Sequence, residues 1–358
     1  MTKKKYMPGI AIMLFLGILA IISCNKTNSN TLTNESVSVS NQTVKSKGKV
    51  YFDLFDTVSY IYSYCGDSEE EFIENTDLAY YTLLKYHQLF DIYHEYEGLN
   101  NLCTINKNPL KEIKVDSALI EFLLYAKKMN DLTNGEMDIM MGSVLSLWHD
   151  ARYSDEPYLP EKSLLEEANK YVGFDFIEIN SENNTVKLLS DKASIDCGAL
   201  GKGYATEKAA EALKAKGVTS YVLNIGGNIR IIGTKPDGSG WRTGIKNPKN
   251  PEGDFIVTLN LKDTSCVTSG NYERYFVVDG VKYSHIIDKN TLFPSTYYDS
   301  LTVITDSSAL ADALSTALYS MDYTDSYNTA LKAGVDCLWV FPTGEVKYTP
   351  SLEKLIIK

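Results

Sequence analysis

The sequence predicts an α+β fold in which a mainly antiparallel sheet is covered by packed helices. Two observations support this class. β-rich runs and helical patterns mix along the chain without the regular alternation that a parallel sheet requires. Asp279-Gly280 stands between two β-rich runs, and this dipeptide is a strong signal for an antiparallel hairpin. No internal repeat is visible in the 358 residues.

The first half contains one predicted strand and two predicted helices. Residues 50–64 have the β-branched and aromatic content of a strand. A helix is predicted over 68–93, because apolar residues recur at helical spacing and acidic residues in its first turn favour the helix dipole. Asp116 is expected to be the N-cap of a second helix, which stops near Gly135. The apolar positions of the first helix are Phe72, Ile73, Ala79, Leu83, Tyr86 and Phe90.

The second half is richer in strands. A short strand is expected to end at residues 194–196, followed by an Ala-rich helix over 201–216 that Gly217 caps. Apolar β runs at 221–225 and 229–232 are separated by Gly226-Gly227, and further strand signals lie around Trp241 and at 255–261, 274–278 and 301–305. A final helix is predicted to begin at Ser307 or Ser308.

The first 49 residues indicate targeting and a linker. Lysines at 3–5 precede an apolar run over 9–22 that is too short to span a bilayer comfortably, and the run ends at Ser23-Cys24. This pattern resembles a bacterial lipobox, which predicts a signal peptide over 1–23 and lipidation of Cys24; a signal anchor or an ordinary secretory peptide is the alternative. Residues 24–49 lack aromatic side chains and predict a flexible tether. We therefore expect a folded domain over 50–358, lipid-anchored at the extracytoplasmic face of the cell membrane.

Charge and cysteine content narrow the function class. The formal net charge is −11 and no basic stripe occurs, which disfavours nucleic-acid binding. An anionic ligand would need the positive field of a metal ion or of backbone dipoles. The scattered cysteines form no CxxC pair, so they predict mostly buried free thiols, with one disulfide left open. The cysteines after residue 24 are Cys65, Cys103, Cys197, Cys266 and Cys337.

His285 is the first candidate for catalysis. It follows the predicted hairpin, and Asp288 lies three residues further on. Histidine transfers protons near neutral pH, and a nearby carboxylate can orient it or take the proton itself. The alternative is a structural residue at the foot of the hairpin. His87, His94 and His149 have no such setting and predict surface or helix-packing roles.

A glycine-rich segment over 196–204 is the second candidate. Its three glycines allow the backbone to approach a ligand closely, and the following helix presents its N-terminal amides. Phosphate is therefore the expected ligand. The segment lacks the P-loop and Rossmann patterns. Taken alone, the segment is better explained as a glycine-rich turn between a strand and a helix.

Asp312 and Thr316 are the third candidate. They lie one helical turn apart on a shared face of the last predicted helix. A carboxylate with a hydroxyl is a hard-oxygen pair suited to Mg²⁺, which uses few protein ligands and keeps phosphate and water as the rest. The alternative is a polar face hydrogen-bonded within the helix.

Seven segments in order resemble the ApbE family, the FAD:protein FMN transferases or flavin transferases. They span nearly all of the chain from residue 50 onward. They are Phe55-Asp56-Thr57, Gly135-Glu136-Met137-Asp138-Ile139 with Leu147-Trp148, residues 196–204, Asn224-Ile225-Gly226-Gly227-Asn228-Ile229-Arg230, Thr268-Ser269-Gly270-Asn271-Tyr272, His285-Ile286-Ile287-Asp288, and Ala311-Asp312-Ala313-Leu314-Ser315-Thr316. The chain departs from the family at Phe55-Asp56 and at Cys197 to Leu200, so Cys197 is not expected to be a nucleophile.

This resemblance implies an activity and a set of site residues. Family members bind FAD with Mg²⁺ and transfer FMN to a Thr or Ser hydroxyl of an acceptor flavoprotein, with release of AMP. By analogy, the acceptor here is expected to be a membrane electron-transfer subunit or another extracytoplasmic flavoprotein. The resemblance assigns metal binding to Asp312, Thr316 and the Ala199 carbonyl, and it assigns proton transfer to His285 with Asp288. FAD contacts are implied for Phe55, Tyr93, Met137, Asp138, Ile139, Asp196, Lys202 and His285.

Two other functions remain open. FAD could be hydrolysed to FMN and AMP, because water can replace the acceptor hydroxyl while the rest of the site is unchanged. Alternatively, the chain could hold or deliver flavin without chemistry. A pair of metal-binding side chains together with a proton acceptor is more than flavin storage requires. This favours the two catalytic functions over binding alone.

Overall fold

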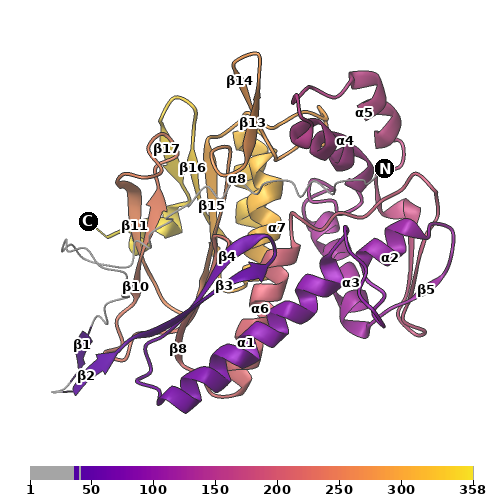
Figure 1. Ribbon diagram of the computed structural model, residues 1–358. Coiled ribbons are helices and arrows are strands. Elements are labelled where there is room, and N and C mark those ends of the chain that lie inside the picture. Colours follow the sequence, from indigo (N-terminus) through magenta and orange to yellow (C-terminus); the bar gives the residue numbers. More distant parts are fainter. Residues whose placement is uncertain (1–35, 40–41, 358) are drawn as a thin grey trace, which may run out of the picture.

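An eight-stranded antiparallel sheet forms the centre of the molecule (Figure 1). The computed structural model describes residues 36–39 and 42–357. Every neighbouring pair in the sheet is antiparallel, which confirms the predicted class. In spatial order the strands are β17 (Val346–Tyr348), β16 (Asp336–Val340), β15 (Ser300–Thr305), β12 (Ser265–Gly270), β9 (Asn228–Gly233), β8 (Ser220–Ile225), β4 (Thr57–Ser63) and β3 (Lys47–Leu54).

Smaller sheets surround this centre. Three of them are two-stranded and one has three strands. The pairs are β1 (Ser36–Val39) with β2 (Gln42–Lys45), β10 (Trp241–Lys246) with β11 (Phe255–Leu261), and β13 (Tyr275–Val278) with β14 (Val281–Ser284). The three-stranded sheet contains β5 (Ile113–Lys114), β7 (Thr185–Leu188) and β6 (Ile177–Asn180).

Helices cover one face of the central sheet and extend to one side of it (Figure 1). α7 packs on β12 and β15, α6 packs beside α7, and α1 packs beside α6. The helices are α1 (Glu69–Phe90), α2 (Leu102–Lys107), α3 (Ser117–Leu132), α4 (Gly142–Tyr153), α5 (Lys162–Asn169), α6 (Gly201–Ala215), α7 (Ser308–Tyr319) and α8 (Tyr323–Ala333), with 3-10 turns at Phe174–Phe176 and Pro350–Leu355.

Neighbouring residues of the central strands enter two different cores. Side chains alternate between the two faces of a strand, so Leu223 joins the core beneath the helices while Val222 joins the core beneath β10 and β11. Val303 and Ile304 divide in the same way. Both faces of the sheet are therefore buried, which explains why these strands are apolar almost throughout.

Several predicted elements are confirmed by their caps. Ser68 and Glu71 form a capping box at the start of α1, and the Asp116 side chain accepts from the Ala118 amide at the start of α3. Ser307 caps α7 in the same manner, and Gly217 follows α6 with a φ of 91°. Helices α2, α4 and α5 were not predicted.

Four predicted boundaries differ from the structure. The strand expected over 50–64 is two strands, because Phe55 and Asp56 turn the chain with φ values of 54° and 50°. The domain start expected at residue 50 lies inside β3, which pairs with β4 from Lys47 onward. The strand expected to end at 194–196 is a single parallel bridge between Met141 and Ser194. α7 is not the final helix, since α8 follows it.

Other predictions for the N-terminal region lie largely outside the described residues. The predicted signal peptide over 1–23 and the lipidation site Cys24 fall there entirely. In the predicted tether over 24–49, β1 and β2 pair with each other and β3 begins. Within the described part of the chain, no helix is both long enough and apolar enough to cross a membrane.

The crossing of α6 and α7 depends on a glycine. A Cβ added to Gly203 would lie 2.2 Å from the Asp312 Cβ and 2.4 Å from the Ser308 carbonyl oxygen. Glu207, one turn later on α6, accepts from the Ser308 amide at 2.5 Å and lies 3.2 Å from the Arg230 Nε. The glycine allows the close approach, and the buried ion pair with its amide contact holds the start of α7 in place.

We predict that Gly203→Ala lowers the free energy of unfolding by about 1–3 kcal/mol, because the added methyl group overpacks the crossing. Urea denaturation measures this change. Gly198→Ala is the matched control, since its Cβ would meet only a side-chain oxygen of Asp196 at 3.1 Å. Equal stability of the two variants would contradict the crossing constraint.

Candidate functional site

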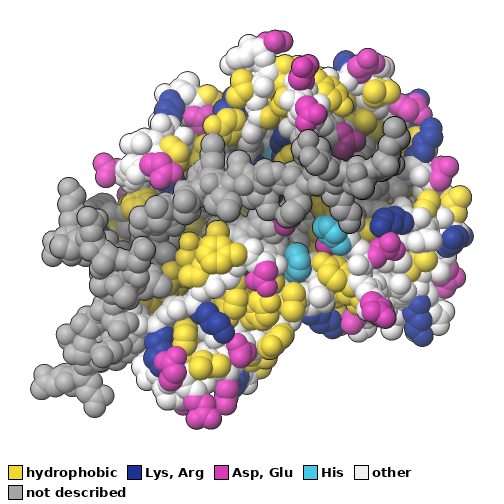
Figure 2. Space-filling view, viewed as in Figure 1, with side chains coloured by type: hydrophobic (Ala, Val, Ile, Leu, Met, Phe, Trp, Pro, Cys, Tyr) yellow, Lys and Arg dark blue, Asp and Glu magenta, His cyan; other side chains and the backbone are white. Residues whose placement is uncertain are grey.

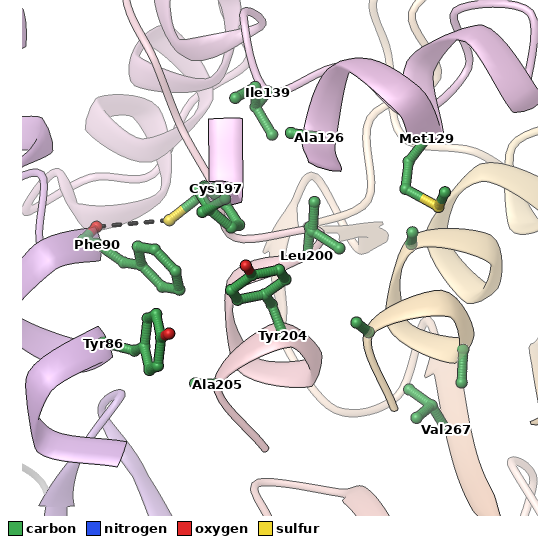
Figure 3. Packing of buried hydrophobic residues seen from close by; sticks show 14 of the residues in the cluster. Tyr86, Phe90, Ala126, Met129, Ile139, Cys197, Leu200, Tyr204, Ala205 and Val267 are labelled. Atoms are coloured by element: carbon green, nitrogen blue, oxygen red, sulfur yellow. Dashed lines mark hydrogen bonds between the residues drawn. The ribbon is translucent and has the colours of Figure 1, made fainter. Parts of the chain in front are cut away.

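The glycine-rich loop before α6 places Cys197 and Asp196 in different environments. The Cys197 thiol is buried and donates to the Phe90 carbonyl at 3.4 Å, beside the rings of Phe90 and Tyr204 (Figure 3). Burial raises the pKa of this thiol, so the residue is a core group and not a nucleophile, as expected. Asp196 is half-buried, and its carboxylate accepts from the Gly198 amide at 2.8 Å.

The loop joins a second predicted segment through the backbone. The Asp196 amide donates to the Ile139 carbonyl at 2.7 Å. Met137 and Ile139 have side chains that are 1% and 0% exposed and belong to the main core, so their side chains cannot contact a ligand. Asp138 is half-buried, and burial raises its pKa. The FAD contact implied for these three residues thus remains open to Asp138 and to the backbone.

Asp312 is held at the start of α6. It is 5% exposed, and its Oδ2 accepts from the Gly203 amide at 2.7 Å. In a regular helix this amide would donate to the Ala199 carbonyl, four residues earlier. The described residues contain no hydrogen bond to that carbonyl. Because the Gly203 amide donates its hydrogen bond to Asp312, the Ala199 oxygen remains available.

The three predicted oxygen donors, from Ala199, Asp312 and Thr316, have the chemistry that suits a hard cation. Thr316 lies one turn after Asp312 and is half-buried, and within the described residues its hydroxyl has no hydrogen-bond partner. A carboxylate, a hydroxyl and a free carbonyl suit Mg²⁺. No group of three or more His, Cys, Asp or Glu in the described ranges could hold a metal. A magnesium site here would thus rely on a single carboxylate.

His285 is oriented by the backbone of the hairpin that precedes it. Its amide and its Nδ1 lie 3.1 and 3.0 Å from the Arg274 carbonyl oxygen, which faces it at the foot of β13 and β14. A carbonyl can only accept, so Nδ1 carries the proton and Nε2 keeps its lone pair. The ring is exposed, so Nε2 is free to take a proton from a ligand.

Asp288 does not contact His285 by any hydrogen bond in the described residues. It is 3% exposed, and its carboxylate accepts from the amides of Asn290 and Thr291 at 2.7 and 3.4 Å. The carboxylate therefore closes its own turn, and the orienting role expected of it belongs to the Arg274 carbonyl. A catalytic role for Asp288 stays a prediction.

The first hairpin is tied to the same place. The Arg274 guanidinium donates to the Asp56 carbonyl at 3.5 Å, and the Phe55 amide donates to the His87 Nδ1 at 3.1 Å. Phe55 and Asp56 both have left-handed backbone conformations, which are costly for side chains larger than glycine. The His87 contact ties this turn to α1, and the Arg274 contact ties it to the loop before the hairpin that leads to His285.

Three cations act on His285 from three elements. Desolvation by its surroundings, followed by Arg274, Lys202 and Arg152, lowers its pKa to about 4 although the ring keeps an exposed edge. From the sequence, only a metal ion or backbone dipoles were expected to supply a positive field for an anionic ligand. The structure adds these side chains, while on the face in Figure 2 acidic and basic groups are interspersed. Lys202 was predicted; Arg152 and Arg274 were missed, although Arg274 lies only two residues after the segment Thr268 to Tyr272.

Tyr93 stands near this group of charges. Its ring is 52% exposed and lies 5.4 Å from the His149 ring, centroid to centroid. Burial, and then the Asp196 carboxylate, raise its pKa to about 12. His149 also lies close enough to Asp196 to lower the pKa of that carboxyl against the larger effect of burial. His149 therefore belongs to the site, which its sequence setting did not indicate.

Comparison with known proteins gives a consistent family. A family model described as "ApbE family" matches residues 68–339. The FAD:protein FMN transferase of Treponema pallidum (strain Nichols) is 31% identical over 250 residues, covering 66% of this chain and 68% of that protein. The enzyme of the same name from Vibrio cholerae serotype O1 is 30% identical over 228 residues, covering 63% and 68%.

Solved structures share the fold. The crystal structure of the ApbE protein from Thermotoga maritima matches with a TM-score of 0.78 at 27% identity. The match covers 87% of this chain and 100% of that one. The flavin transferase ApbE from Vibrio cholerae has a TM-score of 0.74 at 22% identity, covering 87% and 99%, which shows a common fold alone.

We predict that His285 titrates near pH 4 and is neutral at pH 7, because its pKa lies below the ordinary value of 6.5. Below pH 6.5 the unfolded chain binds this proton first, so the contribution of His285 to stability is lost as the pH falls from 6.5 toward 4. NMR of the labelled imidazole measures the titration. Arg274→Gln should raise the midpoint.

Lys282→Gln is the control for this titration. Lys282 lies on the same hairpin, with its Nζ 4.0 Å from the Tyr275 ring centroid, and it is not among the cations that lower the pKa of His285. A midpoint of 6.5 in the unaltered protein, or equal shifts in both variants, would show that the three cations do not act on His285.

Proposed function

Because the chain belongs to the ApbE family, we propose that it transfers FMN from FAD to a Thr or Ser hydroxyl of an acceptor flavoprotein and releases AMP. One observation carries the proposal: the exposed His285 has its Nδ1 bound to a backbone carbonyl and keeps a free Nε2 lone pair, in the field of three cations that lower its pKa. This arrangement suits a reaction that deprotonates a hydroxyl beside a diphosphate. The relatives at 31% and 30% identity, both named FAD:protein FMN transferase, support the same activity.

The residues of this chain have distinct tasks in the reaction. Lys202, Arg152 and Arg274 offset the charge of the FAD diphosphate. His285 takes the proton of the acceptor hydroxyl at Nε2 while the hydroxyl oxygen bonds to the FMN phosphorus. The bond from that phosphorus to the bridging oxygen breaks, and the electron pair leaves with AMP. Proton acceptance of this kind contributes roughly 10²- to 10⁴-fold to the rate.

Mg²⁺ is part of the proposal. Asp312, Thr316 and the Ala199 carbonyl would hold it, and their free oxygens fit a cation that prefers oxygen ligands. When bound, the ion supplies positive charge to the diphosphate oxygens. Burial raises the pKa of Asp312, so a nearby cation would relieve the cost of keeping this carboxylate ionised.

Hydrolysis is a second candidate, and one observation favours it. His285 is exposed, so water can reach Nε2 when no acceptor is bound. Water attack at the same phosphorus would release FMN and AMP from FAD. The acceptor alone distinguishes the two reactions, since the remaining residues serve both.

The location of the protein is also a proposal. We place it on the extracytoplasmic face of the cell membrane, anchored by a lipid at Cys24, on the strength of the apolar run that ends at Ser23-Cys24. An acceptor there would be an extracytoplasmic flavoprotein or a membrane electron-transfer subunit. Labelling with a radioactive fatty acid tests the anchor, and Cys24→Ala should abolish the label.

We predict that the protein, incubated with FAD, Mg²⁺ and a flavin-acceptor protein, yields a fluorescent acceptor band in a denaturing gel together with AMP. Asp312→Ala should abolish both products by removing the carboxylate that holds the cation. Asp306→Ala is the control, because this exposed residue precedes α7 and lies outside the oxygen set. AMP without a labelled acceptor would establish hydrolysis. If neither product forms, flavin binding is the only one of the three functions that remains.

Arg152 provides a separate prediction for FAD binding. Its Nε is buried without a hydrogen-bond partner in the described residues, and its charge lowers the pKa of both Asp196 and His285. We expect Arg152→Gln to raise the KM for FAD roughly 10- to 100-fold, since a charge-assisted hydrogen bond is worth about 1.5–3 kcal/mol. Steady-state kinetics measure this change, with the exposed Arg242→Gln as control. An unchanged KM would remove Arg152 from the site.

A further inference from the structure

A small hydrophobic cluster joins α4 to the hairpin that leads to His285. It is separate from the two cores of the central sheet, and it contains Trp148 of α4, Phe276 of β13 and Leu292 of the segment that follows His285. α4 and the hairpin of β13 and β14 both lie toward the top of Figure 1. The cluster is therefore the packing contact between α4 and the chain that carries His285.

The segment after His285 is closed on itself. We call residues 285–295 the His285 loop. Its two arms are joined by an antiparallel bridge between Ile287 and Pro294, and the Ser295 amide donates to the Ile286 carbonyl at 2.9 Å. Because the arms are paired, the position of the second arm sets the position of the first arm, which begins at His285.

Leu292 holds the strained position of the His285 loop. Its φ of 61° lies in the left-handed region, which is unfavourable for a branched side chain. Its amide donates to the Asp288 carbonyl at 2.7 Å, and the residue is only 5% exposed. A residue in such a conformation persists where the surrounding contacts determine it, and such residues gather at functional sites.

Trp148 supplies a contact that determines this conformation. Its Nε1 donates to the Leu292 carbonyl at 2.9 Å, in a buried hydrogen bond. In the described part of the chain, no other hydrogen bond reaches that carbonyl. A phenylalanine or leucine at 148 would fill much of the same space without satisfying the buried oxygen. Packing alone therefore does not explain the indole.

The indole ring of Trp148 contacts the chain both before and after His285. It lies 5.3 Å from the Phe293 ring of the His285 loop and 6.2 Å from the Phe276 ring of β13, centroid to centroid. Phe276 stands two residues after Arg274, whose carbonyl orients the His285 imidazole. One side chain thus packs against both supports of the histidine.

α4 is itself fixed to another part of the fold. The Gly142 amide at its start donates to the Ser194 carbonyl at 3.1 Å. Trp148 and Arg152 are four residues apart, so they lie on one face of the helix. The Trp148 hydrogen bond therefore fixes the His285 loop relative to a helix that is held elsewhere and that supplies Arg152 to the site.

We propose that Trp148 is a positioning residue for His285: its indole N–H holds the left-handed Leu292 and thereby fixes the His285 loop against α4. This inference rests on the proposed transfer reaction, in which His285 takes the proton of the acceptor hydroxyl. A proton acceptor must be placed accurately, since a misplacement of about 1 Å can lower a rate about 100-fold.

The test removes the indole N–H and follows both the reaction and the His285 ring. Trp148→Phe keeps an aromatic ring and loses the donor. We expect kcat, measured by AMP release from FAD with the flavin-acceptor protein, to fall roughly 10- to 100-fold, while the KM for FAD changes less than about threefold. Nitrogen NMR without FAD at pH 7 should show the His285 proton on Nδ1 in the unaltered protein and exchanging between Nδ1 and Nε2 in the variant.

A second variant removes the donor without changing the size of the ring. Benzothienylalanine incorporated at position 148 has a sulfur atom in place of the Nε1–H group. It should reproduce the loss of kcat and the change of the His285 tautomer. This variant keeps the test decisive if the smaller ring of phenylalanine disturbs the packing of the cluster.

Trp339→Phe is the matched control. The Trp339 Nε1 also donates a buried hydrogen bond, to the Ser326 Oγ at 2.8 Å, and its ring contacts are with Tyr323 and Tyr327 of α8. Both Trp→Phe variants should therefore lower the thermal unfolding midpoint, since each leaves a buried acceptor unpaired. Trp339→Phe should leave kcat and the His285 tautomer unchanged.

The outcomes separate this inference from the proposed function. An unchanged His285 tautomer in both variants at position 148 would overturn the role of Trp148 and leave the transfer reaction standing. Equal losses of kcat in Trp148→Phe and Trp339→Phe would also overturn it, because any loosening of the fold would then slow the reaction. If the unaltered protein transfers no FMN, the proposed function fails, and the NMR comparison still decides whether Trp148 positions His285.

Discussion

The close crossing of α6 and α7 is the constraint on which the site depends. Gly203 has no side chain, so the Asp312 carboxylate reaches the Gly203 amide at 2.7 Å. That contact buries the carboxylate and leaves the Ala199 carbonyl free. Glu207 and Arg230 hold the start of α7 from the other side of the crossing. A bulkier residue at 203 would separate the two helices and with them the oxygen donors.

The site brings acidic and basic groups together around Lys202, whose charge lowers the pKa of Asp196, Asp312 and His285. Burial raises the pKa of Asp196 and Asp312, whereas desolvation and neighbouring cations lower the pKa of His285. A cation would relieve the first effect, and the second keeps the imidazole neutral and able to accept a proton. Opposed shifts of this kind are typical of sites that handle charge and protons together.

Much of the fold followed from local patterns, and the failures have a common cause. Features that depend on residues close in sequence could be predicted. These are the caps of α1, α3 and α7 and the separation of β8 from β9 by Gly226-Gly227. The turn at Phe55 and Asp56 was missed because no glycine or proline marks it and a bulky aromatic residue rarely adopts the left-handed conformation. Their left-handed conformations are held by His87 and Arg274, which lie far away in the chain. Local propensity carries no record of such contacts.

By itself, the sequence determined the fold class, the family motifs and the candidate residues His285, Asp312 and Thr316, because spacing and residue chemistry are local properties. Only the tertiary structure decided which groups meet. It assigned the orientation of His285 to the Arg274 carbonyl rather than to Asp288, turned Met137 and Ile139 into the core, and added Arg152 and His149. These contacts join residues separated by long stretches of chain, so they depend on how helices and strands pack.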